Sequence, residues 1–201
     1  MELFQPQPDF NLLPCDGLVN YHGPILSEQN STKFYHTLFQ SIPWAHDEVV
    51  LFGKRIVMAR KVAWYGDADY SYTYSGSTKH AQIWTPELAQ IKALAEKQTG
   101  SFYNSCLLNL YHDGSEGMGW HSDDEKCLGK ENVIASISFG AERKFYFKHK
   151  NTNKLISITL ENGSLLVMKG ATQANWLHSI PKSKKIKTPR INLTFRTIVL
   201  P

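Results

Sequence analysis

The apolar positions of residues 27–42 recur at helical spacing. Starting at Phe34, an apolar side chain returns every fourth position, which predicts an amphipathic helix. Asn30 or Ser31 is expected to cap its N-terminus, and Pro43 is expected to end it. We expect one face of this helix to pack against a sheet.

A second helix is predicted more firmly, over residues 85–100. Thr85 is a good N-cap, Pro86 suits the first helical position, and Gly100 suits the C-terminal cap. Apolar residues between these limits again fall on one face. Both helices are therefore interpreted as buttresses of a β-sheet.

Most of the remaining chain has the short, β-branched and aromatic runs that are typical of strands. Residues 1–26, by contrast, are punctuated by prolines and are expected to be irregular. Many short strands in the last hundred residues favour a mainly β (α+β) fold of the sandwich or jelly-roll kind. The predicted strands are 48–52, 55–65, 70–76, 105–111, 132–140, 144–149, 154–160, 163–168 and 190–200.

Composition restricts the class of protein only moderately. Of the 201 residues, 42% are hydrophobic and 20% charged, and the net charge is +4, which fits one globular domain and permits a polyanionic partner. Cys15, Cys106 and Cys127 form no CxxC pair, so a disulfide framework is not expected and a reducing compartment fits. Without a leader or an apolar run of spanning length, we expect no membrane contact and a cytoplasmic protein, nuclear if eukaryotic. Nothing in the pattern suggests a dimer seam, so a monomer is expected.

The stretch WHSDDE, residues 120–125, raises the first chemical question. On an extended backbone His121 and Asp123 point to the same face, so an imidazole and a carboxylate converge. Such a pair is common by chance, and a solvated acidic turn is the simpler interpretation. A metal site needs a third ligand, for which His178 stands out because it shortly precedes an unusual strand.

That strand, residues 190–196, alternates strictly between polar and apolar side chains. Its polar set holds two arginines, Arg190 and Arg196. On an edge strand this set would face water, but inside a barrel an arginine would need a carboxylate partner. Two histidines and one carboxylate are typical of non-haem Fe(II) oxygenases, although zinc accepts the same ligands. The arginines favour iron with a 2-oxo-acid cosubstrate.

These motifs together resemble the AlkB family of Fe(II)- and 2-oxoglutarate-dependent dioxygenases. HSD, a histidine about fifty-five residues later and the run RINLTFR carry the resemblance, and NLY, DDE, SISFG, GSLL and TQANWLHSIP support it. The similarity extends over roughly residues 45–197 and is closest to the branch that prefers double-stranded DNA. It implies Fe(II), 2-oxoglutarate and O2 as cofactor and cosubstrates.

The resemblance also implies a role for particular residues. His121, Asp123 and His178 would bind iron. Arg190 would hold the distal carboxylate of 2-oxoglutarate, and Arg196 would belong to both the catalytic and the cosubstrate groups. The rest of the cosubstrate pocket would be formed by Asn109, Tyr111, Asn192 and Thr194.

The implied fold is a double-stranded β-helix within a single catalytic domain, residues 1–201. Residues 101–201 would form this core with the iron and 2-oxoglutarate site. Residues 1–100 would supply an N-terminal extension, buttressing helices and a β-hairpin nucleotide-recognition lid.

A base inside a duplex cannot reach buried iron, so the target base must be flipped out or unpaired. By resemblance Tyr74 would stack on that base, Phe52 would wedge into the duplex, and Glu125 would read the base edge. The simpler alternatives are aromatic core residues, packing beneath a hairpin and a solvated lysine loop. The expected nucleic-acid contacts are Phe52, Arg60, Tyr72, Tyr74, Glu125, Lys184 and Lys185.

The activity that the resemblance implies is direct-reversal DNA repair. N-methylated bases such as 1-methyladenine and 3-methylcytosine, and further etheno adducts, would be the substrates, with duplex DNA preferred. The alternatives are the same chemistry on single-stranded DNA or RNA, or a nucleic-acid-binding jelly roll without catalysis.

Overall fold

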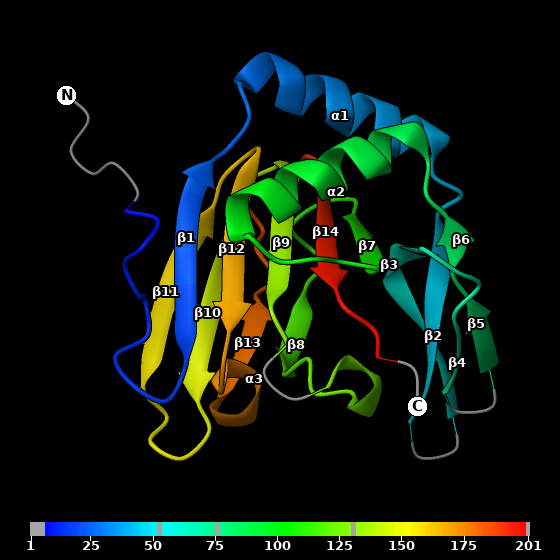
Figure 1. Cartoon of the computed structure of the whole chain (residues 1–201). Helices are drawn as coiled ribbons and strands as arrows, with labels where there is room; N and C mark the ends of the chain where they lie inside the picture. The colour runs from blue at the N-terminus through cyan, green and yellow to red at the C-terminus, as the bar shows by residue number, and fades with distance from the viewer. Residues whose placement is uncertain (1–6, 52–53, 75–76, 130–131, 200–201) are drawn as a thin grey trace.

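The structure is a computed structural model that describes residues 7–51, 54–74, 77–129 and 132–199. Two β-sheets face each other, and two long helices cover the outer face of the larger sheet (Figure 1). The helices are α1 (Glu28–Ser41), α2 (Pro86–Thr99) and the single-turn α3 (Thr172–Asn175), with a 3₁₀ turn at Lys126–Leu128.

The larger sheet runs in the order β1-β12-β9-β14-β7-β3-β2, and β6 pairs with β3 in parallel. Its strands are β1 (Leu18–Pro24), β2 (Ala45–Leu51), β3 (Lys54–Gly66), β6 (Gln82–Ile83), β7 (Ser105–Tyr111), β9 (Ile134–Gly140), β12 (Ser164–Lys169) and β14 (Arg190–Arg196). Every pairing along the main order is antiparallel.

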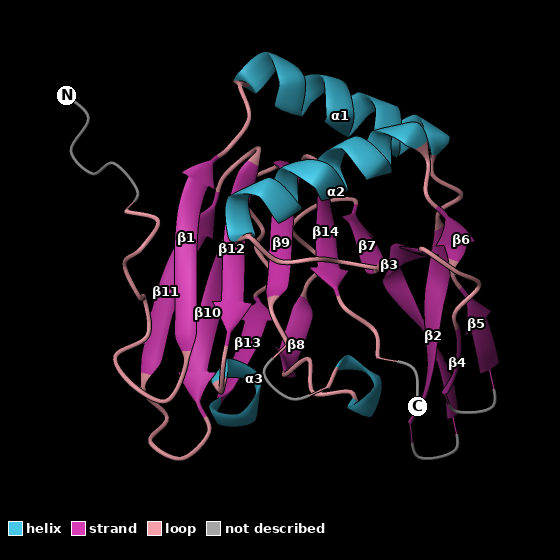
Figure 2. Cartoon of the chain, in the orientation of Figure 1, coloured by secondary structure: helices cyan, strands magenta, loops and turns pink. Residues whose placement is uncertain are grey.

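The smaller sheet has the antiparallel order β11-β10-β13-β8. Its strands are β8 (Met118–His121), β10 (Arg143–His149), β11 (Leu155–Leu160) and β13 (Trp176–Ile180). A separate hairpin joins β4 (Ser71–Tyr74) to β5 (Ser77–His80) and lies beside β2 and β6 (Figure 2). Two stacked antiparallel sheets confirm the predicted mainly β, jelly-roll class.

Two apolar cores hold these layers together. One lies between the helices and the large sheet and includes Leu38, Leu88 and Leu193. The other lies between the two sheets and includes Phe147 and Met168. The inner faces of both sheets are therefore apolar, except where polar side chains interrupt the second core. These polar side chains form the site.

The predicted helices are confirmed, with one correction at a cap. In α2, the Thr85 hydroxyl accepts a hydrogen bond from the Leu88 N–H, and Gly100 ends the helix with φ +66°. In α1 the cap is Ser27, which accepts from the Asn30 N–H. Naming Asn30 or Ser31 as the cap was wrong, because the cap lies three residues before Asn30 and four before Ser31.

Five strands fall outside the sequence prediction: β1, β5, β6, β8 and β13. The proline-rich segment before residue 27 was expected to be irregular, yet β1 pairs with β12 along its length. Its position at the edge of the sheet explains this, since a proline at the end of an edge strand removes no ladder hydrogen bond. The short strands β8 and β13 carry little alternation, and both hold predicted iron ligands.

Candidate active site

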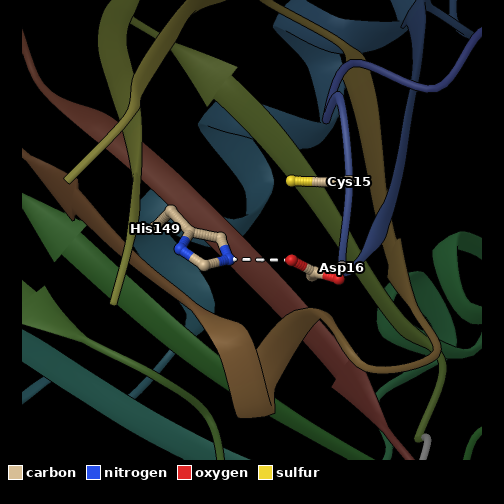
Figure 3. A group of neighbouring side chains, drawn as sticks. All are labelled: Cys15, Asp16 and His149. Carbon is tan, nitrogen blue, oxygen red and sulfur yellow. Dashed lines mark hydrogen bonds and ion pairs between the residues drawn. The ribbon is translucent and has the colours of Figure 1, made fainter. Parts of the chain in front are cut away.

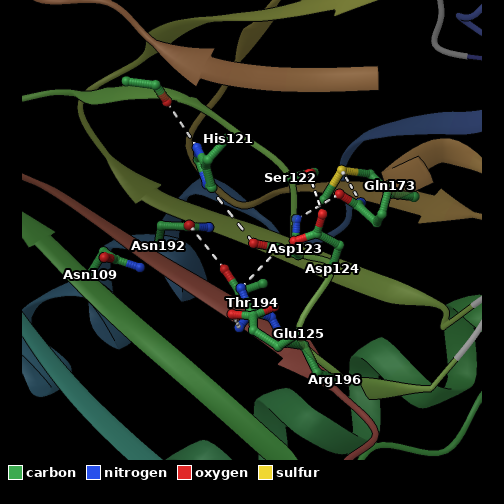
Figure 4. Close-up of polar contacts among 12 residues, drawn as sticks. Asn109, His121, Ser122, Asp123, Asp124, Glu125, Gln173, Asn192, Thr194 and Arg196 are labelled. Carbon is green, nitrogen blue, oxygen red and sulfur yellow. Dashed lines mark hydrogen bonds and ion pairs between the residues drawn. The ribbon is translucent and has the colours of Figure 1, made fainter. Parts of the chain in front are cut away.

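The three predicted metal ligands meet where β8 and β13 pair. His121 ends β8 and lies opposite His178 of β13, and Asp123 follows two residues later. One ligand atom from each lies within 4.8 Å of the others, and the two imidazole rings are 4.2 Å apart between centroids. Figure 4 shows His121 and Asp123 pointing toward one another. Among described residues, this group has the donor set that the sequence predicted.

The hydrogen bonding of His121 and the burial of His178 suit metal binding. Nδ1 of His121 lies 2.9 Å from the Gly119 carbonyl oxygen, so this nitrogen donates and Nε2 keeps its lone pair. Burial lowers the pKa of His178 to about 3. His178 is therefore a neutral ligand near pH 7.

Asp123 is buried and held from two sides. An Arg196 Nη2 donates to its Oδ2 at 2.9 Å, and its backbone N–H donates to Oε1 of Gln173 at 2.9 Å. Burial alone would raise the pKa of Asp123, but neighbouring groups, the charge of Arg196 foremost, outweigh burial and lower it. The carboxylate is ionised and oriented. Gln173, on α3, is a residue that sequence reasoning missed, since only the fold brings it to Asp123.

The other two acidic residues of WHSDDE, Asp124 and Glu125, lie in environments that differ from that of Asp123. Asp124 is exposed and accepts a hydrogen bond from the Ser122 hydroxyl at 3.1 Å. Glu125 returns to the ligand side, where its Oε1 lies 3.7 Å from Nη1 of Arg196 (Figure 4). The single acidic cluster is thus divided into three environments.

Strand β14 places its polar set between the two sheets. Its odd positions, Ile191, Leu193 and Phe195, belong to the core beneath the helices, so the even positions face inward. The alternative of an exposed edge strand is excluded, because β14 pairs with β7 on one side and β9 on the other. The polar side chains Asn192 and Thr194 are both buried.

Arg190 is the most deeply buried charge of this set. Its side chain is 1% exposed, and only Nη2 has a hydrogen bond, to Ser138 Oγ at 2.9 Å. Within the described part of the chain, Nε and Nη1 have no partner. Burial lowers the pKa of Arg190 to about 10, and the guanidinium carbon lies 5.6 Å from the centre of the Tyr111 ring. A buried guanidinium with two nitrogens free to donate fits a carboxylate ligand.

Hydrogen bonds among the smaller polar residues around Arg190 fix the orientation of their side chains. Asn192 Nδ2 donates to Ser136 Oγ at 2.8 Å, and Thr194 Oγ1 donates to Asn192 Oδ1 at 3.2 Å. On β7, Asn109 lies opposite Asn192. The predicted cosubstrate residues are therefore brought together on neighbouring strands.

A pocket of about 740 Å³ adjoins this centre, within the size range of small-molecule sites. The three metal ligands do not line it, but Glu125 and Arg196 do, so these two residues connect pocket and metal group. It is also lined by Asp47 of β2, Trp64 of β3 and Tyr70, which directly precedes β4. Glu125 Oε2 is buried without a hydrogen-bond partner in the described chain.

The expected nucleic-acid residues lie in different situations. Phe52 lies outside the described residues. Tyr72 and Tyr74 lie on β4, and their side chains also lie outside the description. Lys184 and Lys185 are exposed in the loop between β13 and β14.

The position of Arg60 contradicts the expectation that this residue contacts nucleic acid. It is only 7% exposed, and its guanidinium donates to Asn109 and Asp47, each at 3.0 Å. A buried group with these partners is not placed to contact a phosphate from the surface. The sequence pattern does not show this, because Arg60 stands beside Lys61 in a strand with several basic residues.

A second group of potential metal ligands is Cys15, Asp16 and His149 (Figure 3). Nδ1 of His149 accepts backbone N–H groups from Asn151 and Thr152 at 3.2 and 3.1 Å. Its proton is therefore on Nε2, which donates to Asp16 at 3.2 Å. A metal would have to displace this proton, so the group is a structural hydrogen-bonded pair.

The donor chemistry of the first group fits Fe(II), since two imidazoles and one carboxylate leave coordination positions for other ligands. Arg190, with its free N–H groups, fits the carboxylate of a 2-oxo acid beside that metal. Of the described helices, none is long and apolar enough to cross a membrane.

Comparison with known proteins agrees with this geometry. Residues 17–196 match the family described as the 2OG-Fe(II) oxygenase superfamily. The DNA oxidative demethylase ALKBH2 of Mus musculus is 37% identical over 96% of this chain and 85% of the mouse protein. ALKBH2 of Homo sapiens is 36% identical over 96% of this chain and 78% of its own length.

A third relative and a solved structure extend the comparison. The alpha-ketoglutarate-dependent dioxygenase alkB homolog 3 of Bos taurus is 37% identical over 92% of this chain and 65% of its own length. The solved structure of OsALKBH1 superimposes with a TM-score of 0.66 at 16% identity, covering 92% of this chain and 98% of the other, and so shares the fold. The chain therefore belongs to the AlkB family within the 2OG-Fe(II) oxygenase superfamily and is an Fe(II)- and 2-oxoglutarate-dependent dioxygenase.

Proposed function

We propose that this protein repairs DNA by oxidative demethylation of N-alkylated bases such as 1-methyladenine and 3-methylcytosine, with etheno adducts as further substrates. The observation that carries the proposal is the His121, Asp123 and His178 group beside a substrate-sized pocket. The two ALKBH2 relatives, each named a DNA oxidative demethylase, support DNA as the substrate.

Different residues of the site would hold the metal and the cosubstrate. His121, Asp123 and His178 would hold the metal, and Arg190 would bind the distal carboxylate of 2-oxoglutarate through its free N–H groups. When bound, iron and 2-oxoglutarate activate O2, giving succinate and CO2 and oxidising the N-alkyl carbon so that formaldehyde leaves. Arg196 keeps Asp123 ionised and oriented. Asn109, Tyr111, Asn192 and Thr194 would complete the cosubstrate pocket.

The pocket would receive the flipped base. Glu125 lines it, and the buried Oε2 of Glu125 has no hydrogen-bond partner among the described residues. Such an oxygen suits a cationic methylated base with an exocyclic amino donor and disfavours neutral keto bases. Tyr74, with Tyr72 nearby, would stack on the base from the β4–β5 hairpin.

We propose that the enzyme prefers duplex DNA, and the alternative is that it acts on single-stranded DNA or RNA. Phe52 between β2 and β3 would wedge into the duplex, and Lys184 and Lys185 are exposed where they could meet phosphates. Comparing turnover on matched single- and double-stranded lesions, in wild type and Phe52→Ala, separates the two. Duplex activity that survives this substitution would remove Phe52 from the explanation.

We also propose that the chain acts as one catalytic domain and as a monomer, in the cytoplasm or, in a eukaryote, the nucleus. Pairing of β1 with β12 and of β3 with β7 supports a single domain, because both halves of the chain build one sheet.

The decisive experiment measures formaldehyde from a methylated oligonucleotide with Fe(II), 2-oxoglutarate and O2. Wild type should release it, and His178→Ala and Asp123→Ala should release none. His36→Ala is the matched control, since this exposed histidine lies on α1, and it should retain wild-type activity. Absence of product from every protein would contradict the proposal and favour a non-catalytic nucleic-acid-binding protein.

A further inference from the structure

Arg60 connects the wall of the substrate pocket to the cosubstrate side of the site. Its Nη2 donates to Asp47 Oδ2 and its Nε donates to Asn109 Oδ1, both at 3.0 Å. Asp47 lines the 740 Å³ pocket, whereas Asn109 lies opposite Asn192 on the neighbouring inner strand. One guanidinium therefore spans from β2 to β7.

The guanidinium of Arg60 is buried and acts on groups other than its salt-bridge partner Asp47. Its side chain is 8% exposed, and its Nη1 is buried without a hydrogen-bond partner in the described residues. The charge of Arg60 also acts on Tyr111: burial raises the pKa of that phenol, whereas Arg190, Arg60 and Arg143 lower it. Arg60 thus lies close enough to the cosubstrate residues to shape their electrostatic field.

The hydrogen bond to Asn109 has a directional consequence. An amide whose oxygen is held by an arginine must turn its Nδ2 donors to the other side. A carboxylate ligand beside Asn109 needs such donors and is repelled by an amide oxygen. The fixed fork geometry of arginine makes this contact specific, and lysine offers no equivalent.

We propose that Arg60 is a positioning residue for 2-oxoglutarate, which acts by fixing the amide of Asn109. The inference rests on the proposed function only through the identity of the cosubstrate. It replaces the expected phosphate contact, for which a buried guanidinium is poorly placed. It also makes cosubstrate affinity dependent on β3, the strand that forms the lid hairpin with β2.

The test is calorimetric titration of 2-oxoglutarate into the Mn(II)-loaded protein without O2, so that no turnover is needed. Arg60→Met should weaken 2-oxoglutarate binding by roughly tenfold while leaving Mn(II) affinity unchanged, which also shows that the site is folded. Arg55→Met is the matched control. This exposed arginine lies on the same strand and pairs with Glu48, and its loss should not change 2-oxoglutarate affinity.

A double-mutant cycle tests the route through Asn109. Asn109→Ala should lose about as much affinity as Arg60→Met, and the double variant should lose little more, because both remove one interaction. Fully additive losses would overturn the inference. If Arg60→Met does not fold, Arg60→Lys, which retains the charge, should still show weakened 2-oxoglutarate binding.

Two further outcomes are informative. Unchanged 2-oxoglutarate affinity in Arg60→Met, together with a shallower salt dependence of DNA binding, would overturn the inference in favour of the phosphate contact. A wild-type protein that binds Mn(II) but no 2-oxoglutarate would overturn the proposed function itself. The failure of either proposal is therefore distinguishable from that of the other.

Discussion

At the scale of single residues, the metal ligands depend on neighbours that hold their atoms in place. Gly119 fixes the tautomer of His121, and Arg196 orients Asp123 from the side-chain end. Gln173 holds the same aspartate by its backbone N–H, and its own carbonyl oxygen accepts from Lys150 Nζ at 2.9 Å. Loss of such an outer contact typically lowers metal affinity by about 10- to 100-fold.

Removing the Gln173 contact should therefore weaken the metal site. We expect Gln173→Ala to lower Mn(II) affinity by roughly tenfold, because the turn that carries Asp123 loses its anchor. Gln90→Ala, on the exposed side of α2, should leave affinity unchanged. Metal titration followed by electron paramagnetic resonance measures both. Equal affinity in the two variants would show that Asp123 is held by Arg196 alone.

Glu125 should govern the choice of base and not the metal. Glu125→Gln keeps the shape and removes the charge, so turnover of cationic 1-methyladenine should fall several-fold relative to a neutral adduct. Mn(II) affinity should stay at the wild-type level. Competition between the two lesions in one oligonucleotide mixture gives the ratio directly, with exposed Glu142→Gln as control. Loss of metal would show that Glu125 belongs to the ligand set after all.

At the scale of elements, the basic loop between β13 and β14 is anchored to the loop before β8. Gly114 exchanges backbone hydrogen bonds with Ser183 and Ile186, and a side chain at Gly114 would collide with the Ser183 carbonyl oxygen. Buried Arg143 donates to three backbone carbonyls, one of them that of Pro181. The loop that carries these lysines is therefore held in place by hydrogen bonds.

This anchoring makes the lysine contribution measurable. Replacing Lys184 and Lys185 by alanine should weaken binding to all DNA sequences and reduce the salt slope of log K by about two, one for each phosphate contact. The control removes two exposed helix lysines, Lys33 and Lys97, and should leave the slope as it was. Fluorescence anisotropy at several salt concentrations supplies the slopes. A wild-type slope in the loop variant would exclude the loop from the interface.

At the scale of the whole molecule, the site is built between two sheets that must stay together. His121 and His178 belong to the smaller sheet, whereas Arg190 and Arg196 belong to the larger one. A metal and a dicarboxylate bound between them would link both sheets and stabilise the folded chain by mass action.

Metal and 2-oxoglutarate together should therefore raise the thermal midpoint. At about 100 times its dissociation constant a ligand adds about 2.7 kcal/mol, which for a chain of this size is a rise of roughly 5–10 °C. Differential scanning fluorimetry with Mn(II) and 2-oxoglutarate, with and without a chelator, measures the shift. His178→Ala should show almost none of it. A similar rise in that variant would mean that the stabilising metal binds elsewhere.

The sequence by itself determined the second helix, most strands and the alternation of polar and apolar positions along β14. These follow from local periodicity, since helix caps and alternation act over a few residues. The family motifs supplied the chemistry that alternation alone left open between iron and zinc.

Only the tertiary structure decided which groups meet across long stretches of chain. Strand β1 lacks any strand signal and forms because β12 offers an unpaired edge. Gln173 and Arg60 carry no local mark of function, yet one reaches Asp123 and the other Asn109. Their roles arise from burial: a polar group removed from water must find a partner, and the fold determines which partner is near.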